Sequence, residues 1–120
     1  MQIQDRTLEF GVEILRFADK LPKTVAGAVI AKQVIRSGTS IGANMEEADG
    51  AASKKDFINK VIISRKEARE TRYWLLLIQK AGLLHHESNI KLLEEMIKES
   101  HELMKILSAI VNKAKEKGHF

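Results

Sequence analysis

The sequence predicts an all-α fold, an antiparallel up-down-up-down four-helix bundle. The 120-residue chain has one proline and 30% charged residues, a composition that suits helices packed side by side. Its apolar residues recur at spacings of three and four over four long segments, as they do on one face of an α-helix. Short connections around Pro22, Gly50 and Gly82 require consecutive helices to pack antiparallel. We therefore predict a single domain over residues 1–120.

The first helix is predicted over residues 7–21. Its apolar residues form two rows, one of Leu8, Gly11, Leu15 and Ala18 and one of Phe10, Ile14, Phe17 and Leu21. This face is wider than one partner helix needs, so the pattern predicts burial on two sides. Pro22 ends the helix because proline disfavours helical geometry at the residue before it. Thr24 is predicted to cap the next helix.

The second helix is predicted over residues 25–48 and contains Gly38 and Gly42. A glycine inside a helix costs about 1 kcal/mol relative to alanine, so close approach of a neighbouring helix is the favoured reason for both. A break in the helix near residues 37–40 is the alternative. A phosphate-binding loop is disfavoured because the Gly-x-x-x-x-Gly-Lys-Ser/Thr spacing and a preceding strand are missing.

The third helix is predicted over residues 54–81. Ser53, followed three residues later by Asp56, is typical of a capping box, and Gly82 suits a left-handed C-terminal cap. The predicted core row of this helix is Phe57, Val61, Ser64, Ala68, Thr71, Leu75 and Ile78. The fourth helix is predicted over residues 89–115. Its inner row is Leu93, Ile97, Ser100, Met104, Leu107, Val111 and Ala114.

Candidate residues for chemistry are few, and none has a convincing spacing. The chain has no cysteine, which excludes disulfide scaffolds, zinc fingers and thiol catalysis and fits a reducing compartment. Di-metal bundles use two Glu-x-x-His pairs, whereas here only Glu116 and His119 have this spacing. His85, His86 and His101 have no partner at ligand spacing. We therefore expect no metal, no cofactor and no catalytic residue, so the protein is not predicted to be an enzyme.

No targeting or membrane segment is predicted. The first ten residues already carry charges, unlike a signal peptide. No apolar run approaches the roughly 18 residues that a membrane span needs. We expect a cytoplasmic protein without a membrane partner.

Positive charge is concentrated in the predicted helix 54–81, which has eight basic and three acidic residues in a chain of net charge +4. Arg65, Arg69 and Arg72 are spaced to form one stripe along the helix. Such a stripe suits nucleic-acid phosphates. The candidate contacts are Lys54, Lys55, Lys60, Arg65, Arg69 and Arg72. The alternative is a solvated face whose cations pair with acids such as Glu47. Because no aromatic residue interrupts the stripe, base stacking is not predicted.

Glu67 falls on the face of the third helix between Ile63 and Trp74, where its carboxylate would be partly buried. A buried carboxylate requires hydrogen bonds, and Ser40 or Asn44 of the second helix are possible donors. We therefore predict a structural polar network of Ser40, Asn44 and Glu67 that fixes the register of two helices. A functional acid is the alternative.

A set of short motifs follows in order between Gln33 and Leu77. The motifs are Ser40-Ile-Gly-Ala-Asn44, Glu46-Glu47-Ala48, Ser53-Lys-Lys-Asp56-Phe57, Lys66-Glu67-Ala68 with Glu70-Thr71, and Tyr73-Trp74-Leu75. In these motifs the chain resembles the bacterial 23S rRNA intervening-sequence proteins. The resemblance implies a four-helix bundle that forms a ring-like homopentamer, which would explain the wide apolar face of the first helix. A related branch resembles the accessory protein of diversity-generating retroelements, a basic pentamer that binds nucleic acid and a reverse transcriptase.

The biochemical role of this family is largely undefined, and the resemblance implies a nucleic-acid or ribonucleoprotein accessory role. The first hypothesis is a homo-oligomer, in particular a pentamer, that binds RNA or DNA without sequence specificity. The second is a scaffold that docks a partner enzyme without binding nucleic acid. The sequence departs from strongly basic members by acids on the fourth helix, namely Glu94, Glu95, Glu99 and Glu102. These acids count against nucleic-acid binding more than against the fold.

Overall fold

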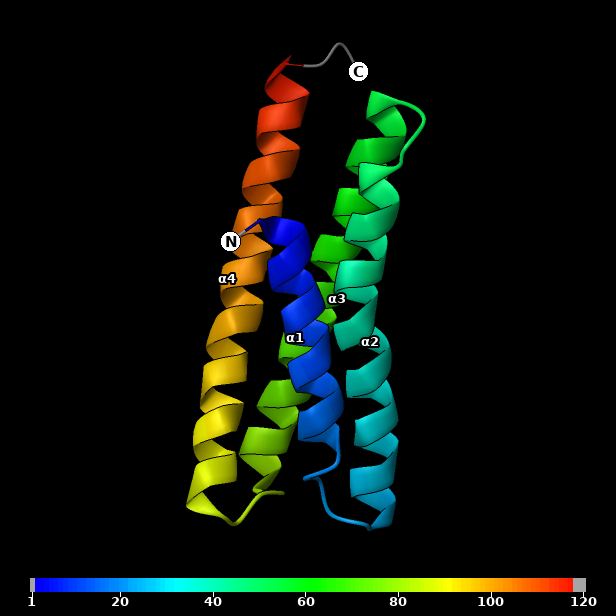
Figure 1. Ribbon diagram of the computed structural model, residues 1–120. Helices are drawn as coiled ribbons and strands as arrows, with labels where there is room; N and C mark the ends of the chain where they lie inside the picture. The colour runs from blue at the N-terminus through cyan, green and yellow to red at the C-terminus, as the bar shows by residue number, and fades with distance from the viewer. Residues whose placement is uncertain (1, 118–120) are drawn as a thin grey trace.

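Four α-helices make up the computed structural model, which describes residues 2–117 (Figure 1). In chain order they are α1 (Ile3–Ala18), α2 (Val25–Asp49), α3 (Lys54–Ala81) and α4 (Glu87–Lys117). Consecutive helices run in opposite directions (Figure 1), and no strand occurs among the described residues. The predicted antiparallel four-helix bundle is confirmed.

The middle helices begin and end close to their predicted bounds because the predicted caps form. The hydroxyl of Thr24 accepts a hydrogen bond from the Gly27 amide at 3.1 Å. The hydroxyl of Ser53 accepts one from the Asp56 amide at 3.1 Å. After α3, Gly82 takes the left-handed conformation with φ of 65°, which lets the chain leave the helix without a Cβ clash.

The predicted bounds of α1 were wrong by four residues at its start and three at its end, and those of α4 by two at each end. α1 starts at Ile3 rather than residue 7, since Ile3 already packs against the core. It ends at Ala18 rather than Leu21, because the amide of Leu21 donates to the Ala18 carbonyl in a tighter turn. Pro22 sets the latest possible end of such a helix, not the actual one. α4 is longer than predicted at both ends, beginning at Glu87 and running through Lys117.

Close approach of α1 and α2 explains the two glycines inside α2, which is continuous through residues 37–40. A Cβ atom on Gly38 would lie 2.7 Å from Cγ1 of Ile14. A Cβ atom on Gly42 would lie 3.2 Å from the carbonyl oxygen of Thr7. The predicted close packing is confirmed, and the predicted alternative of a broken helix is wrong.

The two apolar rows of α1 have different environments. Phe10, Ile14 and Phe17 of the second row are fully buried in the core. In the first row, by contrast, Leu8 is 66% exposed and Leu15 is 50% exposed. A single chain therefore covers only one side of the wide apolar face of α1.

The core rows of the other helices follow the predicted spacing with local shifts. In α3, Ile58 is buried and the predicted Phe57 is only half-buried. In α4, Met96 and Leu103 are fully buried, although neither belongs to the predicted inner row. Each shift of one residue turns the buried side by about 100° around the helix axis.

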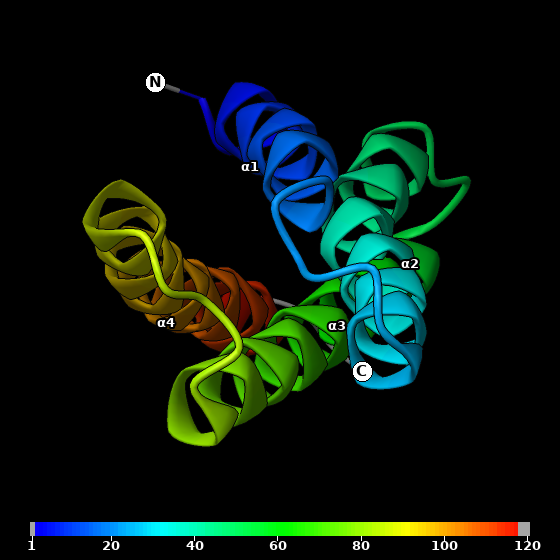
Figure 2. The same cartoon turned by 90° about the horizontal axis from the view of Figure 1, so that it is seen from below.

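The bundle is open on one side. α1 packs on α2, α2 on α3 and α3 on α4, whereas α1 touches α4 at few positions. The view along the bundle shows α1 and α4 splayed apart at the end of the molecule nearest the viewer (Figure 2). α1 has 16 residues and α4 has 31, so the first helix covers only part of the length of the last.

Candidate nucleic-acid interface

The solvent side of α3 carries a continuous stripe of exposed residues without an acid. The members of this outer stripe of α3 are Lys66, Arg69, Tyr73, Leu77 and Lys80. They stand at spacings of three and four, so they share one face of the helix. Within the described part of the chain, no carboxylate pairs with Lys66, Arg69 or Lys80. The stripe is therefore a run of uncompensated positive charge.

The six cations predicted from the sequence differ in their exposure. Lys54 and Lys55 are exposed in the first turn of α3, and Arg69 is exposed in its middle. The remaining three, Lys60, Arg65 and Arg72, are half-buried. The Nζ atom of Lys60 lies 2.9 Å from Oε1 of Glu47, so this cation is paired as the alternative interpretation anticipated.

The stripe of Arg65, Arg69 and Arg72 is thus not uniformly open to solvent. The Nε atom of Arg72 is buried and has no hydrogen-bond partner among the described residues. Of the three arginines only Arg69 is fully on the solvent side, where its exposed basic neighbours are Lys66 and Lys80. The exposed charge is rotated around α3 from the position that the sequence predicted.

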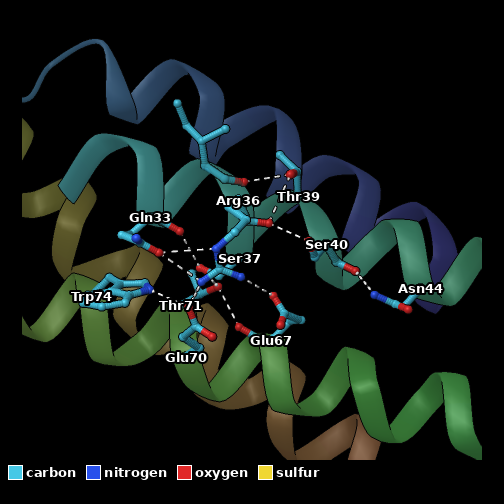
Figure 3. Close-up of polar contacts among 11 residues, drawn as sticks. Gln33, Arg36, Ser37, Thr39, Ser40, Asn44, Glu67, Glu70, Thr71 and Trp74 are labelled. Atoms are coloured by element: carbon cyan, nitrogen blue, oxygen red, sulfur yellow. Dashed lines mark hydrogen bonds and ion pairs between the residues drawn. The ribbon is translucent and has the colours of Figure 1, made fainter. Parts of the chain in front are cut away.

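Beside the outer stripe, Arg36 of α2 bridges two acids of α3 (Figure 3). Its Nη1 atom lies 3.2 Å from Oε2 of Glu67, and its Nη2 atom contacts Oε2 of Glu70. The Nη2 group also donates to Oε1 of Gln33 at 3.1 Å. The indole of Trp74 donates to Glu70 at 3.0 Å. We call Gln33, Arg36, Glu67, Glu70 and Trp74 the Arg36 cluster.

The predicted donors for Glu67 were wrong. Glu67 is partly buried as expected, with 14% of its side chain exposed, but its partner is Arg36. The hydroxyl of Ser40 donates to the Arg36 carbonyl at 2.6 Å. The side-chain amide of Asn44 donates to the Ser40 carbonyl at 2.8 Å. Short polar side chains inside a helix reach the carbonyl one turn back, whereas the long Arg36 side chain spans to α3.

Two further polar contacts cross between α2 and α3 inside the core. The hydroxyl of Thr71 donates to Oγ of Ser37 at 2.8 Å. The hydroxyl of Ser64 donates to the carbonyl of Ile41 at 2.8 Å. All three hydroxyl-bearing side chains are fully buried, where an unpaired polar group would be costly. These bonds therefore fix the register of the two helices.

The open side between α1 and α4 is acidic. Arg6 makes two hydrogen bonds of 2.7 Å to the carboxylate of Glu99. Glu9, Glu13 and Glu95 line a groove of about 410 Å³ around this pair. Burial raises the pKa of Glu13, and the charges of Glu99, Glu9 and Glu95 raise it further. Glu95 and Glu99, two of the acids that counted against nucleic-acid binding, thus face α1.

A second groove, about 320 Å³ in volume, runs between α1 and α2 and is largely apolar. We call it the α1–α2 groove. Its lining includes Leu8, Gly11, Val12 and Leu15 from α1 and Thr39, Gly42 and Ala43 from α2. Leu8, Val12 and Leu15 are the large apolar residues of α1 that remain exposed.

No metal centre is found in the part of the chain that the structure describes, since no three potential ligands gather there. Of the Glu-x-x-His pair, Glu116 is exposed in α4, whereas His119 lies outside the described residues. Across residues 2–117, no helix combines the length and the apolar character needed to cross a membrane.

Comparison with known protein families identifies the family of this chain. The model of the 23S rRNA-intervening sequence protein family matches residues 1–109. The chain belongs to this family. Three of the residues that carry the resemblance to 23S rRNA-intervening sequence proteins, Glu67, Glu70 and Trp74, form the α3 side of the Arg36 cluster in this chain. The resemblance that the sequence indicated is confirmed.

A solved structure is similar over almost the whole chain. It is the crystal structure of a protein with unknown function from the S23 ribosomal protein family of Bacteroides thetaiotaomicron VPI-5482. The two chains are 40% identical and superpose with a TM-score of 0.82, covering 92% of this chain and 98% of the other. No curated protein matches the sequence.

Sequence reasoning missed Arg36, Lys66 and Lys80 as members of these surfaces. A signal for Arg36 was present, since Glu67 and Glu70 stand one turn apart and require a cation nearby. The exposure of Lys66 and Lys80 depends on which side of α3 the helix α4 covers, which spacing along α3 does not give.

Proposed function

We propose that this protein is a non-catalytic, cytoplasmic homo-oligomer, in particular a pentamer, that binds RNA or DNA without sequence specificity. The observation that carries the proposal is the outer stripe of α3. Its cations Lys66, Arg69 and Lys80 are exposed and unpaired with acids in the described chain. Lys54 and Lys55 add exposed positive charge at the start of the same helix.

Charge on this face acts on phosphates through counterion release. Each phosphate that a lysine or arginine neutralises frees condensed counterions, so affinity falls steeply as salt rises. Base-specific contacts are not needed for such binding. Arg36 pairs with both Glu67 and Glu70, so the Arg36 cluster leaves one net negative charge beside the three cations of the stripe.

Fluorescence anisotropy with labelled oligonucleotides tests the proposal. We expect binding at about 50 mM salt that weakens by orders of magnitude toward about 200 mM. Arg69→Gln lowers the affinity and reduces the salt slope by about 1. Lys105→Gln is the matched control, since it removes one charge from an exposed position of α4 that pairs with Glu102. Absence of binding at low salt, or an equal effect of both variants, contradicts the proposal.

The oligomer is supported by the exposed apolar residues of α1. Leu8, Val12 and Leu15 line the α1–α2 groove, and monomers rarely leave such a contiguous apolar surface uncovered. Light scattering is the direct test. A wild-type mass of one 13.5 kDa chain overturns the oligomer. Val12→Asp places a charge in the groove and is expected to lower the mass.

A protein-docking scaffold is the second candidate, favoured by the same α1–α2 groove. A partner helix seated there would cover the exposed leucines without involving α3. The two candidates separate by mutation. A partner protein retained by Arg69→Gln and lost by Val12→Asp supports the scaffold, whereas nucleic-acid binding that is weakened by Arg69→Gln supports the first proposal.

A further inference from the structure

Tyr73 stands in the middle of the outer stripe of α3 with 56% of its surface exposed. Of the Phe, Trp and Tyr residues that the structure describes, Tyr73 alone is exposed. Phe10 and Phe17 are buried in the core, and Phe57 and Trp74 are half-buried. A single exposed aromatic side chain is common on protein surfaces, so the residues around Tyr73 decide what role it has.

The ring of Tyr73 is supported from one side. It meets the ring of Trp74 edge to face, with centroids 5.3 Å apart and planes at 67°. Trp74 in turn donates to Glu70, and Arg36 holds Glu70 from α2 (Figure 3). Tyr73 is therefore an exposed ring resting on a fixed one, which lowers the entropy lost when a ligand stacks on it.

Cations flank this ring along the helix. Arg69 lies one turn before Tyr73 and Leu77 one turn after it, while Lys66 and Lys80 lie about two turns away on either side. All of these residues are exposed and none is acidic. An aromatic platform between cations is the arrangement that sequence-tolerant binding of single strands uses, in which rings stack on bases and cations contact the backbone.

We propose that Tyr73 is a stacking platform for an unpaired base, which makes single-stranded nucleic acid the ligand class of this surface. This inference rests on the proposed function and narrows it. The sequence predicted no stacking because no aromatic interrupts Arg65, Arg69 and Arg72. The exposed stripe is a different set of residues, and Tyr73 is at its centre. Bases inside a duplex already stack on one another, so a duplex offers this face only its phosphates.

The test compares a labelled homopolymer of deoxythymidine with a duplex of the same length. Against the single strand, Tyr73→Ala weakens binding by about 5- to 150-fold, the range for loss of one stacked base. Against the duplex, Tyr73→Ala changes affinity by less than about twofold, because the phosphate contacts remain. Tyr73→Phe keeps the ring and restores single-strand affinity.

Salt dependence separates stacking from charge. Tyr73→Ala leaves the slope of log affinity against log salt unchanged, whereas Arg69→Gln reduces it by about 1. Equal losses on single strand and duplex, or no rescue by Tyr73→Phe, overturn the inference. Wild-type protein that binds neither probe defeats the proposed function itself. Wild-type binding that Tyr73→Ala leaves intact defeats the stacking role alone.

Light scattering completes the test, because an exposed aromatic also suits a contact with a second copy of the chain. We expect Tyr73→Ala to keep the mass and the melting temperature of the wild type. A lower mass for Tyr73→Ala assigns Tyr73 to a subunit interface and overturns the stacking role.

Discussion

The seam between α2 and α3 and the seam between α1 and α4 are built differently. Polar contacts cross the first at several levels, from the Arg36 cluster and the buried hydroxyl pair of Ser37 and Thr71 to the ion pair of Lys60 with Glu47. Across the second, the ion pair of Arg6 with Glu99 lies beside the acidic groove that contains Glu13. The first seam is closed within one chain, and the second is open.

This contrast divides the molecule into a closely packed α2–α3 part and a face of α1 that one chain leaves uncovered. α2 and α3 pack together closely, and their polar contacts hold Trp74 and thus the ring of Tyr73 in place. α1 is shorter, buries one apolar row and leaves Leu8 and Leu15 largely exposed. We infer that nucleic acid belongs on the α3 side of the molecule and that subunits associate through α1.

The sharpest test of the two faces of α1 uses neighbouring residues. Ile14 is fully buried, so Ile14→Ala leaves a cavity and should lower the free energy of unfolding by about 2–5 kcal/mol. Leu15 is 50% exposed within one chain, so Leu15→Ala should cost less than about 0.5 kcal/mol in protein diluted to the monomer, and a larger loss in the oligomer reports contacts between subunits. Urea denaturation monitored by circular dichroism measures both. Similar losses would mean that the two rows of α1 do not differ in burial.

Two glycines test where α1 meets α2. Gly38→Ala places Cβ 2.7 Å from buried Ile14 and should destabilise the protein by about 1–3 kcal/mol, as overpacking does. At Gly11 the nearest atom, Cα of Thr39, would lie 4.0 Å from the new Cβ. Gly11→Ala should therefore stabilise the helix by about 0.5–1 kcal/mol. Thermal melts of both variants should shift in opposite directions, and a shared direction contradicts the close approach.

The closed seam is tested at Arg36. Arg36→Met keeps much of the side-chain volume but leaves the carboxylates of Glu67 and Glu70 without their cation. Leaving partly buried charged groups unsatisfied should cost about 1–3 kcal/mol of stability. Lys105→Met is the control, because its pair with Glu102 is exposed and worth less than about 1 kcal/mol. Equal effects in urea denaturation would show that the Arg36 cluster does not stabilise the seam.

The bundle itself was predictable because spacing along a helix decides which residues share a face. Thr24, Ser53 and Gly82 marked helix ends through local hydrogen bonding and backbone geometry, and neither depends on the rest of the fold. The end of α1 was missed because its last turn tightens at Leu21 before Pro22 is reached. Helix ends were therefore predicted well where the capping residue could be recognised in the sequence.

The surfaces were harder to predict because they depend on how helices pack. The partner of Glu67 follows from the register of α2 on α3, which the contacts of Ser37 and Ser64 fix only once the helices are together. The exposure of Arg65 and Lys66, adjacent in sequence, differs because neighbouring helices cover only one side of α3. Spacing alone identified a cationic helix but not its open face.

The pH dependence of stability tests the open seam between α1 and α4. Its expected effect is the smallest of these predictions. The pKa of Glu13 lies above its usual value of 4.5, because burial and the charges of Glu99, Glu9 and Glu95 disfavour the carboxylate, with Arg16 opposing them. The stability that protonated Glu13 contributes is therefore present below pH 4.5 and is lost as the pH rises through its folded-state pKa. Glu13→Gln cannot ionise, so it should melt at the wild-type temperature near pH 4 and at a higher one near pH 7.

High salt distinguishes the two causes of the raised pKa of Glu13, which are burial and charge repulsion. At about 1 M salt the Debye length is about 3 Å, so the repulsion from Glu99, Glu9 and Glu95 is screened while the burial of Glu13 remains. Because desolvation is the largest single cause, part of the gain from Glu13→Gln at pH 7 should persist in high salt. A gain that disappears in salt would make charge repulsion the main force across the open seam. Equal melting temperatures at pH 7 in low salt would mean that Glu13 ionises in the groove at no cost to stability.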